Sequence, residues 1–212
     1  LPAFKTPDPF ITEQMTIADL LCHRAGWGTF DGDLLWYGTA YTPDEILARH
    51  SSEPFTYPFR TQFGYSNLMY IAAARVVEQV SGMTWDQFIT TRIFKPLGME
   101  RSRVETADLA GMSDVALPHV RKGQDPKSPQ KSMPYQALRG ADGACGVLST
   151  VNDLAKWDAM WADEGKANGK AFLSPASYNR ITAMHLRHAA PGHLQADFHI
   201  RHGAAELQRQ AV

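Results

Sequence analysis

A helix-start signature recurs along the chain: a threonine followed three residues later by an acidic or amide residue. In such a capping box, the threonine oxygen accepts a backbone N–H of the first helical turn. The third residue's side chain in turn accepts the backbone N–H of the threonine. Each pair therefore predicts where a helix begins. The pairs are Thr16 with Asp19, Thr42 with Glu45, Thr84 with Gln87, and Thr150 with Asp153.

These signals predict a mainly helical chain. From Ser66 to Ser81 the apolar residues follow the helical period, which indicates a further helix with one buried face. Strand signals are few: short strands are expected within 143–150 and 171–173, and the proline-rich stretch 119–134 is expected to be a surface loop. The expected helices are 16–26, 42–49, 66–81, 84–94 with its end at Pro96 and Gly98, 150–165, and a short one from Ser174. Such a body has too few strands for a sheet of its own and could be one layer of a larger α/β domain.

Composition narrows the class of protein. A chain of 212 residues with 44% hydrophobic and 20% charged residues is typical of one globular domain. A net charge of -1 gives no electrostatic basis for binding nucleic acid or an anionic membrane. The longest apolar run, Leu68 to Ala74, is too short for a transmembrane segment. The chain starts at Leu1 and reads like the interior of a longer protein, so the sequence leaves its localisation unknown.

The two cysteines and the aromatic residues carry further expectations. Cys22 and Cys145 are too few for a disulfide framework and are expected to be buried free thiols. Trp157 and Trp161 share one helix face and are expected in the core. Five of the eight histidines lie in the last 28 residues, where two pairs have a one-turn spacing acceptable for metal ligands. Only one acid and no cysteine accompany them, so no metal site is predicted. These histidines are His185, His188, His193, His199 and His202.

The segment FGYSNLMY, residues 63–70, joins a turn to the helix predicted from Ser66. Taken alone, Tyr65 and Asn67 fit a helix-capping turn. A second candidate is the loop GDLLWYG, residues 32–38, where Trp36 and Tyr37 could line a substrate cleft or could be buried anchors of the loop. The nucleophile-elbow pattern Gly-x-Ser-x-Gly is absent, which argues against an esterase of the α/β-hydrolase class.

Three segments, TIADLLCHRAGW, FGYSNLMYIAAARVVEQVSGMTWDQFITTRIFKPLGM and GACGVLSTVNDLAKW, resemble in order and spacing the serine β-lactamase-like family. This family includes class C β-lactamases, D-alanyl-D-alanine carboxypeptidases and related serine esterases. The resemblance covers about Leu1 to Trp161. It implies the helical part of the α/β β-lactamase/transpeptidase-like fold, with most of the antiparallel sheet absent. Residues 1–185 would form this partial domain, and 186–212 a tail of uncertain structure that does not resemble the family.

In the family, three motifs meet: a Ser-x-x-Lys nucleophile, a Tyr-x-Asn triplet and a late Lys- or His-x-Gly strand. By position, Tyr65 would be the general base and acid and Asn67 the positioning amide, while Ser66 would have no chemical role. The other two motifs have no match in a suitable context. Ser128-x-x-Lys131 follows Tyr65 in a proline-rich loop and is interpreted as chance, and His202-Gly203 has the wrong spacing. The expectation is therefore a family member truncated at both ends that lacks its nucleophile.

This absence has an energetic consequence. A tyrosine acts as a base at pH 7 only if its pKa falls by about three units, which corresponds to ~4 kcal/mol. In the family the lysines of the missing motifs supply that field, whereas a helix N-terminus contributes only about 0.3–1 kcal/mol. The resemblance thus implies hydrolysis of an ester, a β-lactam or a peptide through an acyl-serine, without a cofactor, while the isolated chain is expected to be inactive. The alternative is an inactive homologue that serves as a binding or structural module. Family members often work outside the cytoplasm, and the oligomeric state is unknown.

Overall fold

The computed structural model describes residues 1, 4–123, 125–138 and 140–185. The predicted capping boxes at Thr16, Thr42 and Thr84 are confirmed, with both reciprocal hydrogen bonds present. At Thr150 the hydroxyl accepts the N–H of Asp153, but the Asp153 carboxylate accepts the backbone N–H of Arg101 and the hydroxyl of Ser102 instead. The fourth pair therefore starts a helix and also ties it to a distant loop.

The α-helices agree with the predicted ranges in most places. They are α1 Pro9–Gln14, α2 Ile17–Leu21, α3 Pro43–His50, α4 Asn67–Ser81, α5 Trp85–Ile89, α6 Lys95–Leu97, α7 Asp142–Cys145, α8 Val151–Ala162 and α9 Pro175–Thr182. Short 3₁₀ turns cover Asp33–Leu35 and Thr106–Leu109. The helix predicted for 16–26 stops at Leu21, because His23 takes a left-handed backbone conformation with φ of 56°.

The region predicted as one helix over 84–94 is divided into three parts. A π-helical turn, Thr90–Phe94, links α5 to α6, and in it the N–H of Lys95 reaches back to the carbonyl of Thr90. Pro96 does not end the helix as predicted but lies within the first turn of α6, where its missing N–H is tolerated. Gly98, with φ of 70°, ends it.

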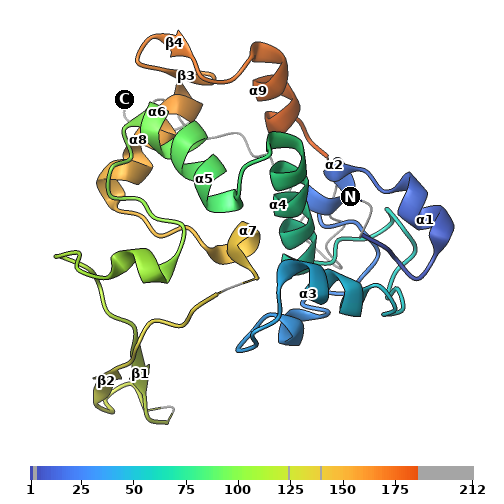
Figure 1. Ribbon diagram of the computed structural model, residues 1–212, viewed down its shortest axis with the longest axis horizontal. Helices are drawn as coiled ribbons and strands as arrows, with labels where there is room; N and C mark the ends of the chain where they lie inside the picture. The colour runs from blue at the N-terminus through green and yellow to red at the C-terminus, as the bar shows by residue number, and fades with distance from the viewer. Residues whose placement is uncertain (2–3, 124, 139, 186–212) are drawn as a thin grey trace, which may run out of the picture.

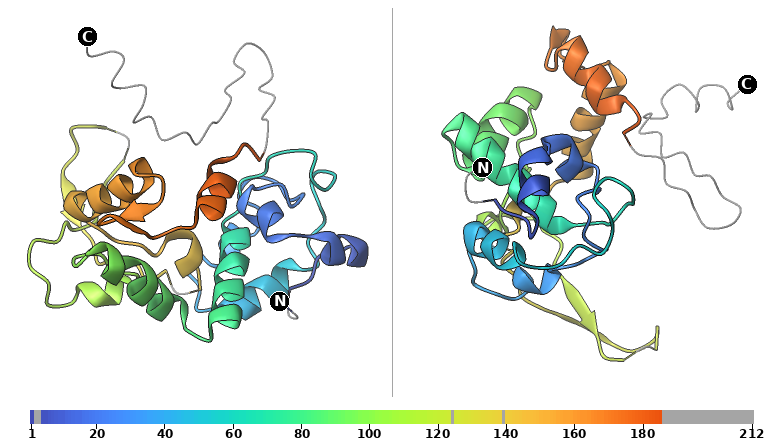
Figure 2. Two further views of the ribbon diagram at one scale, coloured as in Figure 1. Left: turned by 90° about the horizontal axis from the view of Figure 1, so that it is seen from above. Right: turned by 90° about the vertical axis from the view of Figure 1, so that its right-hand side faces the viewer.

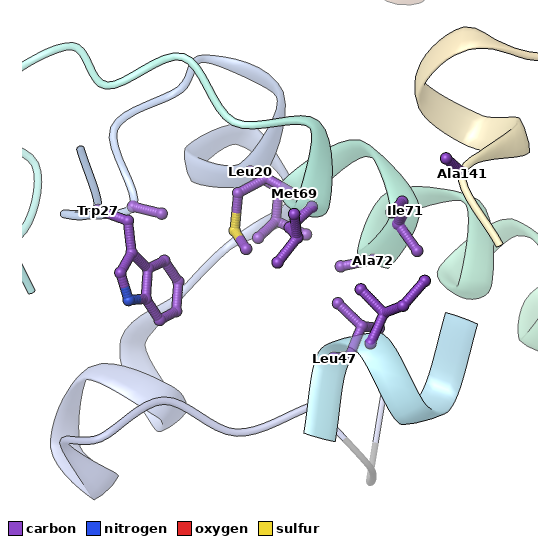
Figure 3. Packing of buried hydrophobic residues seen from close by; sticks show 10 residues of the cluster. Leu20, Trp27, Leu47, Met69, Ile71, Ala72 and Ala141 are labelled. Carbon is purple, nitrogen blue, oxygen red and sulfur yellow. The ribbon is translucent and has the colours of Figure 1, made fainter. Parts of the chain in front are cut away.

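The long helix α4 lies at the centre of the molecule, as Figures 1 and 2 show. It packs against α2, α3, α5 and α7. Its buried face contributes to a core that Figure 3 shows from close by, together with side chains of α2 and α3 and the indole of Trp27. The buried members from α4 are Leu68, Met69, Ile71 and Ala72. This core fixes the first turn of α4, where the candidate triplet lies.

A second core forms between α8 and the region α5–α6. Trp161 is 8% exposed, and Trp157 packs against the same cluster at an edge-on ring distance of 5.7 Å from Trp161. The prediction that both belong to the core is confirmed. Leu154, which shares their predicted apolar face, is 46% exposed.

Within the described residues, the strands form two antiparallel pairs. β1 His119–Arg121 pairs with β2 Gln130–Ser132, and β3 Lys166–Ala167 pairs with β4 Lys170–Ala171. The stretch 119–134 is exposed, as predicted, but its two strands form a hairpin that projects from the body, so the prediction of a loop throughout is wrong (Figure 1). Of the strand predicted at 171–173, only Ala171 lies in β4. The predicted mainly helical body with little sheet is confirmed.

The strand predicted within 143–150 is also wrong. Residues Asp142–Cys145 form helix α7, and only Leu148 makes a single β-bridge, with Arg103. Gly143 lies so close to α4 that a Cβ there would overlap Ala74. The absence of a side chain therefore lets α7 approach α4, a tertiary contact that local sequence preferences do not register.

Cys22 and Cys145 are free thiols, as predicted. The prediction that both are buried is wrong, because Cys22 is half-buried and Cys145 is exposed at the end of α7. No helix of the described residues combines the length and apolar character that a membrane span needs.

One buried polar side chain of the core predicts how stability varies with pH. His50 is 2% exposed, and neither ring nitrogen has a hydrogen-bond partner among the described residues. Burial lowers its pKa from 6.5 to about 4, although nearby Asp31 opposes the shift. The unfolded chain protonates His50 more readily than the folded chain does. The contribution of neutral His50 to the free energy of unfolding is therefore fully present above pH 6.5, and the free energy falls by about 3 kcal/mol as the pH drops to 4.

Urea unfolding from pH 7.5 to 4 measures this effect. The variant His50→Leu should lose much of the pH dependence between pH 6.5 and 4, whereas His119→Leu, which replaces an exposed histidine, should retain it. An unchanged pH dependence in His50→Leu would contradict the prediction.

Candidate active site

Tyr65 lies in the turn just before α4. Its backbone N–H donates to Thr29 Oγ1 at 3.3 Å, and its carbonyl accepts the N–H of Phe30 at 2.8 Å. The side chain is 37% exposed, and its hydroxyl makes no hydrogen bond to any residue that the structure describes. The ring packs against His23 and Phe30, at centroid distances of 4.6 and 5.4 Å. The phenol is thus held at its base, while its hydroxyl is available.

Ser66 separates the two candidate residues and points inward. It is 1% exposed, and its hydroxyl has no partner among the described residues. Its backbone N–H donates to Nδ1 of His23 at 3.1 Å. The extended backbone of Ser66, with φ of -140°, alternates the side chains, so that Tyr65 faces outward while Ser66 faces the core.

Asn67 is the first residue of α4, and its side-chain amide donates to Oδ2 of Asp33 at 2.9 Å. The other carboxylate oxygen of Asp33 accepts Nε1 of Trp36 at 3.0 Å. Asp33 therefore joins Asn67 to Trp36. Since Nδ2 of Asn67 faces Asp33, its carbonyl oxygen Oδ1 is left to accept a hydrogen bond from another group.

Two glycines allow the surrounding loops to approach this closely. Gly32 has φ of 80°, and a Cβ there would lie 2.8 Å from both the His50 ring and Leu68. A Cβ on Gly64 would overlap the carbonyl of Trp27. Both positions need glycine to bring Asp33 and Tyr65 against the same part of the core.

Trp36 and Tyr37 differ in burial. Trp36 is half-buried and packs against the core around α4, whereas Tyr37 is 57% exposed and meets the Trp36 ring edge-on at 5.7 Å. Trp36 is brought to Asn67 through Asp33. A role of Trp36 and Tyr37 in substrate binding stays a prediction.

A buried ionic cluster supports the segment that leads to Tyr65. The Asp19 carboxylate is fully buried and accepts hydrogen bonds from Arg24, Arg60 and Thr16. Burial alone would raise its pKa, but the hydrogen bonds from Arg60, Thr16 and Arg24 hold it well below its ordinary value. The Arg60 backbone N–H also donates to the carbonyl of Arg24 at 3.1 Å, so the cluster ties the segment before Tyr65 to the end of α2.

Sequence patterns alone missed Asp33 and His23. His23 lies in the segment TIADLLCHRAGW that carries the family resemblance, and Asp33 opens the loop with Trp36 and Tyr37. Either segment could have drawn attention to them. Their contacts with Ser66 and Asn67, however, join positions 43 and 34 residues apart, which no local pattern encodes.

Ser128 and Lys131 lie in the projecting hairpin, Lys131 within β2, and not at the start of a helix (Figure 1). Among the described residues, no group of three His, Cys, Asp or Glu side chains is arranged to hold a metal ion. Nε2 of His185 lies 2.7 Å from the carbonyl of Arg180. The other four histidines of the C-terminal segment, and His202-Gly203 with them, lie outside the described residues.

Comparison with known proteins places this geometry in context. The chain is 30% identical over 184 residues to penicillin-binding protein 4 of Amycolatopsis lactamdurans, and this match covers 84% of this chain and 46% of that protein. It is 29% identical over 190 residues to the lovastatin esterase of Penicillium rubens, and this match covers 81% of this chain and 45% of the esterase. The structure matches D-amino acid amidase from Ochrobactrum anthropi SV3 with a TM-score of 0.67 and 21% identity, over 88% of this chain and 53% of the amidase.

The chain therefore spans about half the length of these proteins, and the match to the amidase confirms the predicted partial fold. The sequence profile described as beta-lactamase matches residues 1–204, well beyond Trp161 and into the segment that was expected not to resemble the family. Over nearly its whole length, then, the chain belongs to the β-lactamase family, whose members are serine hydrolases.

Proposed function

We propose that this chain contributes Tyr65 and Asn67 to the active site of a serine hydrolase that cleaves an ester or amide through an acyl-serine intermediate. The observation that carries the proposal is the outward-facing Tyr65 hydroxyl, which lacks a hydrogen-bond partner among the described residues, one position from a buried serine and two from an oriented amide. A capping turn alone would need neither an exposed phenol nor an amide fixed by a carboxylate.

In this proposal the two side chains have different roles. Tyr65 takes the proton of the nucleophilic serine and returns it to the leaving group. Asn67 donates one N–H of its amide to Asp33, and its Oδ1 accepts a hydrogen bond from a substrate N–H or from a lysine ammonium. The indole N–H of Trp36 donates to the same Asp33 carboxylate, and the exposed Tyr37 packs edge-on against the Trp36 ring.

The nucleophile is proposed to come from outside these 212 residues. Ser66, the serine nearest to Tyr65, is buried with its hydroxyl away from solvent. Ser128 lies in the hairpin turn, where its N–H donates to the carbonyl of Asp125 at 3.0 Å. Ser66 precedes α4 directly but has Met69 in place of a lysine one turn along, and Ser128 has Lys131 three residues later but lies in a hairpin and not at a helix start. Neither therefore combines the helix N-terminus and the lysine that activate a nucleophilic serine in Ser-x-x-Lys enzymes.

The substrate class extends from esters to β-lactams and peptides. Relatives of similar identity are named for penicillin binding and for lovastatin ester hydrolysis, so the family likeness does not choose between them. The proposed chemistry needs no cofactor. If the complete gene product has no nucleophile, the chain is instead a binding module with the helical core of an enzyme.

Acylation tests this proposal. The product of the complete gene and the 212-residue chain are each incubated with a fluorescent penicillin and with a fluorophosphonate, and the modified serine is mapped by mass spectrometry. We expect the complete product to be acylated within a Ser-x-x-Lys motif and the 212-residue chain to remain unmodified. Hydrolysis of short p-nitrophenyl esters and of nitrocefin by the complete product then identifies the substrate class.

Acylation of the 212-residue chain at one of its own serines would contradict the proposed origin of the nucleophile. If the complete product is neither acylated nor active on esters, β-lactams or D-alanyl peptides, the enzyme proposal fails and the binding module stands.

A further inference from the structure

His23 binds the backbone on both sides of Tyr65. Its own carbonyl accepts the N–H of Gly64 at 2.9 Å, and its ring Nδ1 accepts the N–H of Ser66 at 3.1 Å. One residue therefore clamps the tripeptide that has Tyr65 at its centre. The left-handed backbone of His23, with φ of 56°, turns its carbonyl and its ring toward this tripeptide together.

The imidazole also packs against two tyrosine rings, tilted relative to one and stacked on the other. Tyr65 lies at 4.6 Å with an angle of 33°, and Tyr70 of α4 lies at 5.1 Å with an angle of 26°. The edge of Phe63 closes the arrangement at 5.3 Å. Tyr70 is fixed in turn, because its hydroxyl donates to the carbonyl of Leu21 at 3.0 Å. The Tyr65 ring thus rests on a support that is itself anchored to α2 and α4.

We infer that the neutral imidazole of His23 is a positioning residue, which holds the Tyr65 phenol in place by accepting the Ser66 amide. The inference rests on the role proposed for Tyr65. Nδ1 can accept only while it carries no proton, so the ring must be the tautomer with its proton on Nε2. A second proton would turn Nδ1 into a donor facing a donor and would leave the Ser66 amide without an acceptor.

The surroundings of the ring are consistent with a neutral imidazole. The rings of Tyr65 and Tyr70 pack against it, Cys22 and Arg24 are its chain neighbours, and Asp19 is paired with Arg24. Burial lowers the pKa of His23, and burial raises the pKa of Tyr70. The clamp is therefore intact at neutral pH and is expected to open on acidification.

Two substitutions separate the acceptor from the ring. His23→Asn retains an acceptor oxygen at about the position of Nδ1 and tolerates the left-handed backbone, but it loses the stacked ring. His23→Phe keeps an aromatic ring and loses the acceptor. If the acceptor positions Tyr65, the asparagine variant should behave like the wild type and the phenylalanine variant should not.

The first measurement is made on the 212-residue chain and needs no activity. In NMR spectra, the ring ¹⁵N shifts should report the Nε2–H tautomer, and the Ser66 amide should titrate together with the His23 ring below pH 6.5. Exchange of the Ser66 amide proton should become ~10-fold faster in His23→Phe but not in His23→Asn. The opposite tautomer, or equal exchange rates in all three proteins, would overturn the inference.

The second measurement uses the complete gene product. His23→Phe should lower kcat by about 10- to 100-fold with less change in KM, because a misplaced base slows chemistry more than binding. His23→Asn should restore most of kcat and remove the contribution of His23 to the acid limb of the pH profile. If Tyr65→Phe abolishes activity while His23→Phe keeps the wild-type kcat, this inference fails and the proposed function survives. If Tyr65→Phe has no effect, the proposed function fails, and the NMR data still decide whether the clamp exists.

Discussion

Replacing Tyr65 by phenylalanine is expected to lower kcat of the complete gene product by about 10²- to 10⁴-fold, the usual contribution of a general acid–base residue. The change removes one oxygen atom and keeps the ring that packs on His23 and Phe30. Because the Tyr65 hydroxyl makes no hydrogen bond within the described part of the chain, unfolding by urea should be almost unaffected. A large loss of kcat with unchanged stability would assign the hydroxyl to chemistry.

Tyr57→Phe is the matched control for this substitution. Tyr57 is half-buried, and its hydroxyl likewise has no hydrogen-bond partner in the described ranges. Its backbone N–H donates to the carbonyl of Gly26 at 2.8 Å. We expect wild-type kcat and KM for Tyr57→Phe on the same p-nitrophenyl ester or nitrocefin. A kcat of Tyr65→Phe within threefold of the control would exclude Tyr65 as the proton carrier.

How far the fold follows from the sequence depends on the range of the interaction concerned. The starts of α2, α3 and α5 were predictable, because a capping box is complete within four residues. The end of α2 was not, since it is set where His23 meets a turn that lies 41 to 43 residues further along the chain. Helix α7 and the hairpin β1–β2 were missed for a similar reason. Gly143 is fixed by contact with α4, and in the hairpin the paired residues His119–Arg121 and Gln130–Ser132 are mostly polar and flank a lysine- and proline-containing turn that is typical of a loop.

The candidate site shows the same division. Tyr65 and Asn67 were found because the triplet at the start of a predicted helix resembles the Tyr-x-Asn motif of the family, a pattern complete within three residues. The groups that hold them, His23 and Asp33, lie in separate loops and reach the triplet only once α4 has packed on its neighbours. Their polar side chains gave no period or spacing from which the contact could be inferred. Nothing in the sequence indicated that the amide nitrogen of Asn67 would donate to Asp33.

Replacing Asp19 by alanine is expected to lower the free energy of unfolding by about 3 kcal/mol. Breaking a buried ion pair costs about 3–5 kcal/mol, and the lower value applies here because Arg24 and Arg60 are 27% and 40% exposed, so water can solvate them. The substitution also removes the acidic member of the capping box of α2. Urea unfolding at pH 7 measures the loss.

Asp44→Ala is the matched control, because Asp44 makes the same two-point contact to an arginine at the surface. Its oxygens accept Nε and Nη2 of Arg75 at 3.0 and 3.1 Å, but its side chain is 55% exposed. Exposed pairs contribute about 0–1 kcal/mol, so the loss should stay below ~1 kcal/mol. Since the folded-state pKa of Asp19 lies below its unfolded value of 3.8, the contribution of its ion pairs is present above that pH. That contribution decreases on further acidification, and the difference between wild type and Asp19→Ala should narrow with it. Equal losses for the two alanine variants at pH 7 would mean that burial of the carboxylate is not what holds Arg60 and the segment leading to Tyr65.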